Sequence, residues 1–100
     1  MHDLEVEMVI VNPKTKRVIF TFQPPARVRK VSVAGEFSLW DPTATPMKKD
    51  AKGLWKTSIK LGPGEYQFRY VADGMNWFSD DSVPRVPNIF GSENSLLKID

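Results

Sequence analysis

The feature that most constrains this chain is an alternating stretch between Leu61 and Trp77 that is bounded by turn signals. Tyr66, Phe68 and Tyr70 recur at every second residue, which is the period of a β-strand with one apolar face. A Gly-Pro-Gly turn precedes this strand and an Asp-Gly turn follows it, so the stretch predicts a hairpin whose second arm carries the tryptophan. The aromatic face has to be buried against a second layer of structure.

The opposite face of the same strand carries Gln67, Arg69 and Val71. Because Arg69 and Trp77 both belong to this hairpin, we expect an arginine and a tryptophan to lie close together on its outer side. Such a pair favours a binding surface there.

The rest of the chain repeats this pattern in short segments, with eight prolines and six glycines separating them. No window shows sustained helical periodicity. Strands are expected at residues 4–11, 17–23, 26–34, 54–61 and 94–99, with a brief pairing at 47–50 and a long loop from Ser79 to Gly91. About seven short strands separated by turns predict an all-β fold, an antiparallel β-sandwich.

Periodicity also predicts which side chains face the core. In the first strand we expect Leu4, Val6, Met8 and Ile10 to face inward. The step from Val28 to Val31 breaks the alternation, which indicates a bulge or a late start of the third strand at Lys30. The core residues expected in the other strands are Val18, Phe20, Phe22, Trp55, Ile59 and Leu61.

Length and composition predict one domain over residues 1–100, with an N-terminal strand and turn at 1–15 and a core at 16–99. Lysines and arginines are scattered and the net charge is only +2, which argues against nucleic-acid binding. The longest apolar run, Met8 to Val11, is too short for a membrane span, and the N-terminus lacks a signal-peptide pattern. The chain has no cysteine, so a soluble, cytoplasmic protein without disulfides is expected.

Catalytic and metal chemistry find little support in the sequence. His2 is the only histidine and lies at the terminus, which excludes histidine-based triads and zinc sites. Asp80 and Asp81 are adjacent in a loop, so we interpret them as solvated turn residues and not as the separated carboxylates of a glycosidase. We therefore expect no catalytic residue, no metal and no cofactor.

Four motifs occur in one order along the chain: G-x-F-x-x-W at 35–40, P-M-x-x-D-x-x-G-x-W at 46–55, G-x-Y-x-F-R-Y at 64–70 and N-x-F-G-x-x-N at 88–94. With them, residues 16–99 resemble the glycogen-binding type of carbohydrate-binding module. That family includes the N-terminal early-set domains of isoamylase and glycogen-branching enzymes and the glycogen-binding domain of the AMP-activated protein kinase β subunit.

The resemblance implies an immunoglobulin-like β-sandwich of the early-set type. It also implies non-catalytic binding of α-1,4-glucan, such as glycogen or starch, at a shallow aromatic site. By position, the family's two sugar-stacking tryptophans fall on Trp40 and Trp77, its basic strand residue on Arg69, and its C-terminal contact loop on Phe90, Ser92 and Asn94. Indoles suit the apolar faces of glucose, while guanidinium and amide groups suit its hydroxyls.

Alternatives remain open from the residues alone. Trp40 is either a ligand platform or a lid on the sandwich edge, and Asn94 is suited to closing the turn before the last strand. The turn after Asp73-Gly74 is one residue longer than the shortest form in the family, and a one-residue shift would turn Trp77 inward. The alternative function is a structural or protein-interaction module that docks onto a glycan-metabolising enzyme or another partner chain through its first strand.

Overall fold

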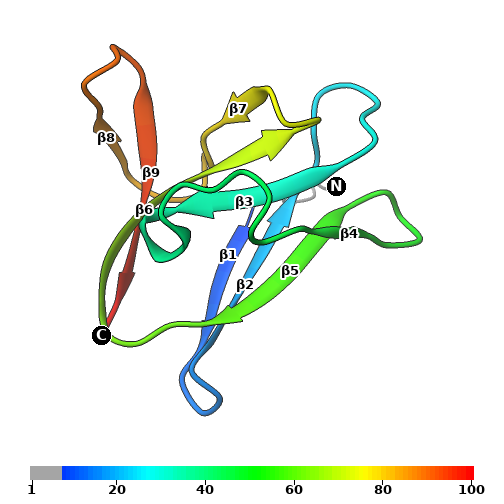
Figure 1. Cartoon of the computed structure of the whole chain (residues 1–100). Helices are drawn as coiled ribbons and strands as arrows, with labels where there is room; N and C mark the ends of the chain where they lie inside the picture. Colours follow the sequence, from blue (N-terminus) through cyan, green and yellow to red (C-terminus); the bar gives the residue numbers. More distant parts are fainter. Residues whose placement is uncertain (1–7) are drawn as a thin grey trace.

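The alternating segments form two antiparallel sheets in the computed structural model, which describes residues 8–100 (Figure 1). The strands are β1 (Met8–Asn12), β2 (Arg17–Phe22), β3 (Val31–Gly35), β4 (Lys48–Lys49), β5 (Trp55–Lys60), β6 (Gly64–Ala72), β7 (Asn76–Phe78), β8 (Arg85–Pro87) and β9 (Glu93–Ile99), and a 3-10 helix, η1, spans Glu36–Ser38. Within this part of the chain no helix is long and apolar enough to cross a membrane.

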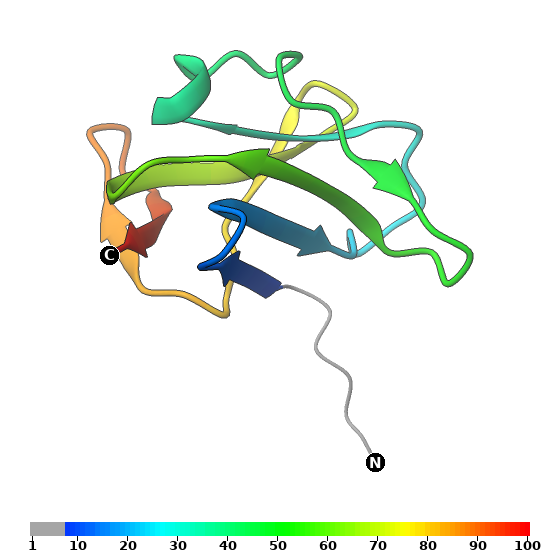
Figure 2. The same ribbon diagram turned by 90° about the horizontal axis from the view of Figure 1, so that it is seen from below.

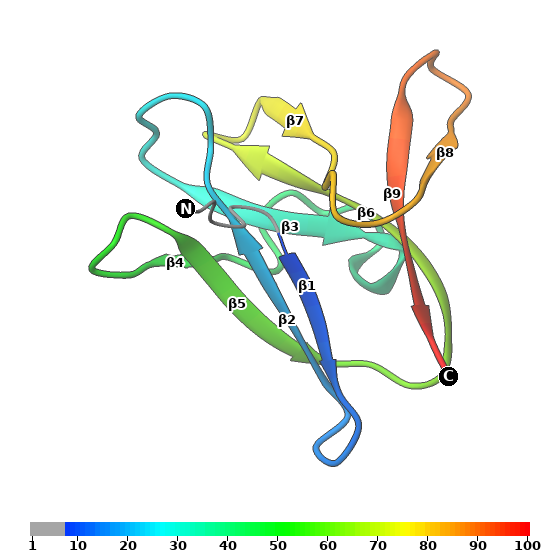
Figure 3. The same cartoon turned by 180° about the vertical axis from the view of Figure 1, so that it is seen from behind.

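Strand β6 is the centre of the second sheet. The first sheet has the order β1-β2-β5-β4, and the second has the order β3-β6-β9-β8, with β7 paired to β6 as well. Figure 2 shows β1 and β2 in a different layer from β3, and Figure 3 shows β1, β2 and β5 side by side. Strand β6 is the aromatic strand predicted from the sequence. It pairs with β3, β7 and β9, so it fixes the positions of these three strands.

Aromatic rings from both sheets fill the space between them. Phe22 stacks on Tyr70 with ring centroids 4.4 Å apart, and Phe20 meets Phe68 edge to face at 5.0 Å. Trp55 joins the same buried cluster. Rings in these arrangements contribute about 0.5–1.5 kcal/mol per pair beyond the burial of their area. The β-sandwich and the inward faces predicted for β2, β5 and β6 are therefore confirmed.

The inward face predicted for the first strand is wrong where the structure describes it. Ile10 is 47% exposed, whereas Val9 and Val11 pack against the core. Pairing with β2 decides this, because Val9 lies opposite the buried Phe20, and residues directly opposite each other share a face. The expectations for Leu4 and Val6, and for the side chain of Met8, lie outside what the structure describes.

Nine strands are present in residues 8–100, where the sequence indicated about seven in the whole chain. The third strand starts late, at Val31, because a side-chain oxygen of Asp73 accepts the backbone N–H groups of Arg29 and Lys30 at 2.8 and 3.0 Å. The predicted loop from Ser79 to Gly91 contains β8. Strand β8 ends at Pro87, which has no backbone N–H to donate. The sheet tolerates this proline because β8 is an edge strand.

The β6–β7 turn determines which way Trp77 points. Asp73 and Gly74 adopt left-handed conformations, and the N–H of Met75 donates to the carbonyl of Ala72 at 3.2 Å. Met75 is the extra residue, because Ala72 pairs with Asn76. Trp77 therefore lies opposite Val71 and on the outer side of β6, while its neighbour Phe78 packs against the core.

The interpretation of Asp80 as a solvated turn residue is wrong. Its side chain is fully buried and accepts hydrogen bonds from the Tyr70 hydroxyl at 2.5 Å and from the backbone and side chain of Ser82 at 2.8 and 2.6 Å. Its N–H donates to Ser95 Oγ at 2.6 Å. The neighbouring Asp81 is exposed and lies 3.5 Å from Arg85. Asp80 thus anchors the β7–β8 connection to the core.

We predict that Asp80→Ala lowers the free energy of unfolding by about 3 kcal/mol, because it removes a buried carboxylate that accepts a short hydrogen bond from the Tyr70 hydroxyl and two more from Ser82. Asp81→Ala, at the adjacent exposed position, is the control and should cost less than about 0.5 kcal/mol. Urea unfolding followed by tryptophan fluorescence measures both, and equal losses would contradict the anchoring role of Asp80.

Candidate functional site

A groove of about 600 Å³ lies on the outer side of the second sheet. Its walls come from the residues around η1, from β6 and β7, and from the β8–β9 loop, which projects away from the sheet in Figure 1. Residues far apart in the sequence therefore meet here, including all six that were proposed from the sequence. The groove is lined by Glu36, Trp40, Gln67, Arg69, Trp77, Pro87, Asn88, Ile89, Phe90, Ser92 and Asn94.

The turn after β3 positions Trp40. Gly35 approaches β6 so closely that an added Cβ would lie 2.6 Å from the Gln67 carbonyl oxygen and 2.9 Å from the Phe68 Cβ. This contact lets the chain turn tightly into η1. The Ser38 hydroxyl bonds to the N–H and C=O of Gly35, and the N–H of Trp40 donates to the Gly35 carbonyl at 2.8 Å.

The same turn holds two residues in a strained backbone conformation. Leu39 and Trp40 both have left-handed φ angles, of 55° and 61°. Each such non-glycine residue costs about 1–2 kcal/mol, and strain of this kind tends to concentrate at functional sites. As a result, the half-buried Trp40 indole lies beside that of Trp77, with ring centroids 6.5 Å apart and ring planes inclined at 44°. Trp40 is a wall of the groove and not a member of the buried core cluster.

Arg69 projects from β6 into the groove that the two indoles also line. Its guanidinium donates to the Trp77 carbonyl at 3.1 Å and, more weakly, to Ser92 Oγ at 3.4 Å. Its buried Nε has no hydrogen-bond partner among residues 8–100. Burial lowers the pKa of Arg69 below its ordinary value, although arginine stays charged at neutral pH. The groove therefore holds a fixed positive charge whose hydrogen-bonding capacity is only partly used.

Asn88 organises the β8–β9 loop. Its side-chain oxygen accepts the N–H groups of Phe90 and Ser92 at 2.9 and 3.2 Å, and its amide donates to Ser92 Oγ at 2.8 Å and to Asn94 at 3.1 Å. Asn94 donates in turn to Gln67 on β6 at 3.0 Å. Asn94 is 8% exposed, so it connects the loop to the sheet, and part of its bonding capacity is already engaged.

The sequence did not single out Asn88, Gln67, Glu36 or Ile89 as site residues. A signal existed for two of them, because Gln67 alternates with Arg69 on one strand face, and Asn88 opens the N-x-F-G-x-x-N motif. Glu36 gave none. Its carboxylate accepts the Gln67 N–H at 2.7 Å beyond the end of β3, a bond that only the sheet register creates.

Two apolar side chains project from the loop tip beside these polar groups. Phe90 is 85% exposed and Ile89 is 91% exposed, yet both border the groove. An exposed adjacent pair of large apolar residues is unfavourable unless something covers it. The groove thus combines two indoles, an exposed apolar rim, and a set of amide, hydroxyl and guanidinium groups. Among the described residues, no group of three or more His, Cys, Asp or Glu side chains could hold a metal ion.

Comparison with known proteins identifies the family. Residues 18–100 match the family model described as the glycogen recognition site of AMP-activated protein kinase. The chain belongs to this family. The resemblance inferred from the four motifs is thereby confirmed, and the β-sandwich that it implied agrees with the two antiparallel sheets observed.

Three relatives match parts of the chain. They are Protein PTST homolog 2, chloroplastic, of Arabidopsis thaliana (37% identical over 75 residues), Protein FLOURY ENDOSPERM 6, chloroplastic, of Oryza sativa subsp. japonica (31% over 70) and the 1,4-alpha-glucan branching enzyme GlgB of Nostoc sp. (32% over 90). The matches cover 75%, 70% and 80% of this chain but only 14%, 13% and 12% of those proteins.

We predict that Gly35→Ala lowers the free energy of unfolding by about 2 kcal/mol, because the added methyl group meets the backbone of β6. Gly62→Ala is the matched control, since nothing lies within 4 Å of its Cβ position. It should be neutral or stabilise by up to about 1 kcal/mol. Thermal and urea unfolding measure both variants, and similar effects at the two glycines would contradict the close approach as the reason for Gly35.

Proposed function

We propose that this domain binds α-1,4-glucan, such as glycogen or starch, in the groove and catalyses no reaction there. The observation that carries the proposal is the meeting of Trp40, Trp77 and Arg69 with the β8–β9 loop in one hollow. Membership of the glycogen-recognition family supports the class of ligand, and the name of one relative refers to 1,4-alpha-glucan.

The tryptophan pair suits a curved chain of sugars. Each indole offers a flat apolar surface to the C–H face of a glucose ring. The 44° inclination between the two rings means that two linked sugars, one on each indole, must be turned relative to each other. An α-1,4 linkage turns successive glucose units in this way, whereas a β-1,4-linked chain is a flat ribbon. The geometry therefore favours α-glucan over cellulose-like chains.

Hydroxyl groups of the bound chain would meet Arg69, Ser92 and Asn94. The guanidinium has donors to spare, the Ser92 hydroxyl retains its own proton, and the Asn94 amide can form further bonds. Phe90 would cover the outer edge of the sugars. In this proposal the loop supplies both polar and apolar contacts, and Asn88 holds it in place.

The carboxylates do not support glycoside hydrolysis. That reaction ordinarily needs two carboxyl groups across the scissile bond. Of the described residues that line the groove, Glu36 alone carries a carboxylate, and its oxygen accepts a backbone N–H from Gln67. Asp80 is buried beneath the sheet instead of facing the groove. Detectable hydrolysis of amylose by the purified domain would contradict a non-catalytic role.

Binding to a single site should be weak. A few contacts of about 1 kcal/mol each, less the cost of association, give a Kd on the order of 0.1–1 mM. A polymeric ligand or a tethered partner would raise the effective affinity, since further contacts then form at high local concentration.

We predict that migration through a native gel slows when glycogen is included, and that Trp40→Ala or Trp77→Ala reduces the affinity about tenfold or more because each removes a stacking platform. Leu39→Ala is the control, since it removes an exposed apolar side chain next to Trp40 that does not line the groove. Wild-type protein whose mobility is the same with and without glycogen would overturn the proposal.

A second function, contact with a protein, is favoured by the edge that β1 forms in the first sheet, where no other strand of residues 8–100 pairs with it. Strand β1 is an edge strand, and its exposed Ile10 lies opposite Ile19 on β2, so an apolar pair faces outward. If copies of the chain associate through this edge, the sedimentation coefficient rises with concentration and Ile19→Thr suppresses the rise. A concentration-independent monomer would contradict self-association through β1.

A further inference from the structure

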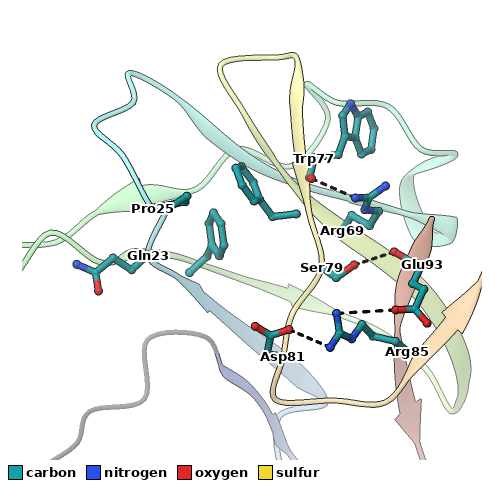
Figure 4. A pocket seen from close by; sticks show the side chains of 10 residues that line it. Gln23, Pro25, Arg69, Trp77, Ser79, Asp81, Arg85 and Glu93 are labelled. Atoms are coloured by element: carbon teal, nitrogen blue, oxygen red, sulfur yellow. Dashed lines mark hydrogen bonds and ion pairs between the residues drawn. The ribbon is translucent and has the colours of Figure 1, made fainter. Parts of the chain in front are cut away.

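A second hollow, of about 440 Å³, adjoins the groove at the hairpin that carries Arg69 and Trp77, and Figure 4 shows the side chains that line it. These two residues line both hollows, so they form a ridge between them. In Figure 4 the ridge stands across from Gln23 and Pro25, which come from the segment after β2. The lining also includes two apolar rings, those of Phe22 and Phe78.

Charged and polar groups line the lower part of this second hollow. Arg85 lies 3.5 Å from Asp81 and 3.8 Å from Glu93, and the Ser79 hydroxyl donates to the Glu93 carbonyl at 2.7 Å (Figure 4). The side chains of Arg85, Asp81 and Glu93 are each about half exposed or more. Ion pairs of this kind contribute little to stability, so a ligand can replace them at low cost.

We propose that the second hollow binds further sugar residues of the same α-glucan chain whose other residues stack on Trp40 and Trp77. The proposal rests on the function proposed above and extends it, because it assigns a ligand length. The domain should then recognise a chain that crosses the ridge, and it should bind longer malto-oligosaccharides more tightly than those that fill the groove alone.

The chemistry of the two hollows is complementary along such a chain. The groove supplies the stacking surfaces, whereas the second hollow supplies a guanidinium, two carboxylates and an amide. Planar groups of this kind hydrogen-bond pairs of sugar hydroxyls. A chain that leaves the face of an indole turns its hydroxyl rim toward the protein, where Arg85 and Glu93 lie within reach of the ridge. The volume is that of a small-ligand site.

Continuity across the ridge is supported by how its parts are held. Arg69 donates to the Trp77 carbonyl and to Ser92 Oγ, and Ser92 is followed in sequence by Glu93, whose side chain faces the second hollow. Both hollows are therefore built on the same pair of elements, β6 and the start of β9. A sugar chain long enough to cross Arg69 and Trp77 would therefore contact both hollows.

Calorimetric titration with maltotriose and with maltoheptaose tests the proposal. We expect Arg85→Ala to weaken maltoheptaose binding about fivefold, the effect of losing one charge-assisted hydrogen bond, and to leave maltotriose binding unchanged. The greater number of binding registers on a longer chain is the same for both proteins and cancels in this comparison. Amide chemical shifts of Ser79 and Gln23 should respond to maltoheptaose and not to maltotriose.

Lys98→Ala is the matched control, because it removes an exposed cation that is paired with Glu65 and lines neither hollow. It should change neither affinity. An Arg85→Ala variant that loses both ligands equally, or loses neither, would overturn the second site while leaving the groove intact. If wild-type protein binds neither oligosaccharide nor glycogen, the function proposed for the groove fails as well.

Discussion

The structure depends on one constraint. Strand β6 is paired along both of its edges, so its side chains must alternate between the core and the outer face. Pairing with β3 on one edge and with β7 and β9 on the other prevents the strand from slipping or turning. Phe68 and Tyr70 must then face the core, and Gln67 and Arg69 must face outward. The same nine residues thus help to hold the two sheets together and contribute Gln67 and Arg69 to the groove, so stability and the proposed binding depend on one strand.

Hydrogen bonds connect β6 and β9 to the loops that surround the groove and fix the conformations of those loops. The buried Asp80 ties the segment after β7 to Tyr70 in the core and to Ser95 on β9. Further out, Asn94 links β9 to Gln67, and Asn88 fixes the loop tip. Because each bond joins elements that the sheet has already brought together, the loop conformation follows from the packing and adds little cost of its own.

The groove is a compromise between stability and exposure. Three features around the groove are each unfavourable for folding alone. They are the left-handed residues Leu39 and Trp40, the partly desolvated Arg69 whose Nε has no hydrogen-bond partner among residues 8–100, and the exposed apolar pair at the loop tip. These features lie around one hollow, as expected for a binding site. A ligand can bind only to apolar surface that the protein leaves exposed and to donors that the protein leaves unused. A chain of sugars would cover the apolar rim and use the free donors.

The sequence by itself determined the β-sandwich and the inward aromatic faces of β2, β5 and β6, because alternation and turn residues act over a few neighbouring positions. The segments proposed for the site came from the resemblance to the glycogen-binding family and not from alternation. The sequence could not determine the facing of β1, the burial of Asp80 or the outward direction of Trp77. Ile10 faces outward because β2 sets its register, and Trp77 does so because Met75 forms an extra residue in the turn. Asp80 is buried because it accepts a hydrogen bond from the Tyr70 hydroxyl and its N–H donates to Ser95 Oγ. Each outcome depends on a partner distant in sequence, and only the tertiary structure brings those partners together.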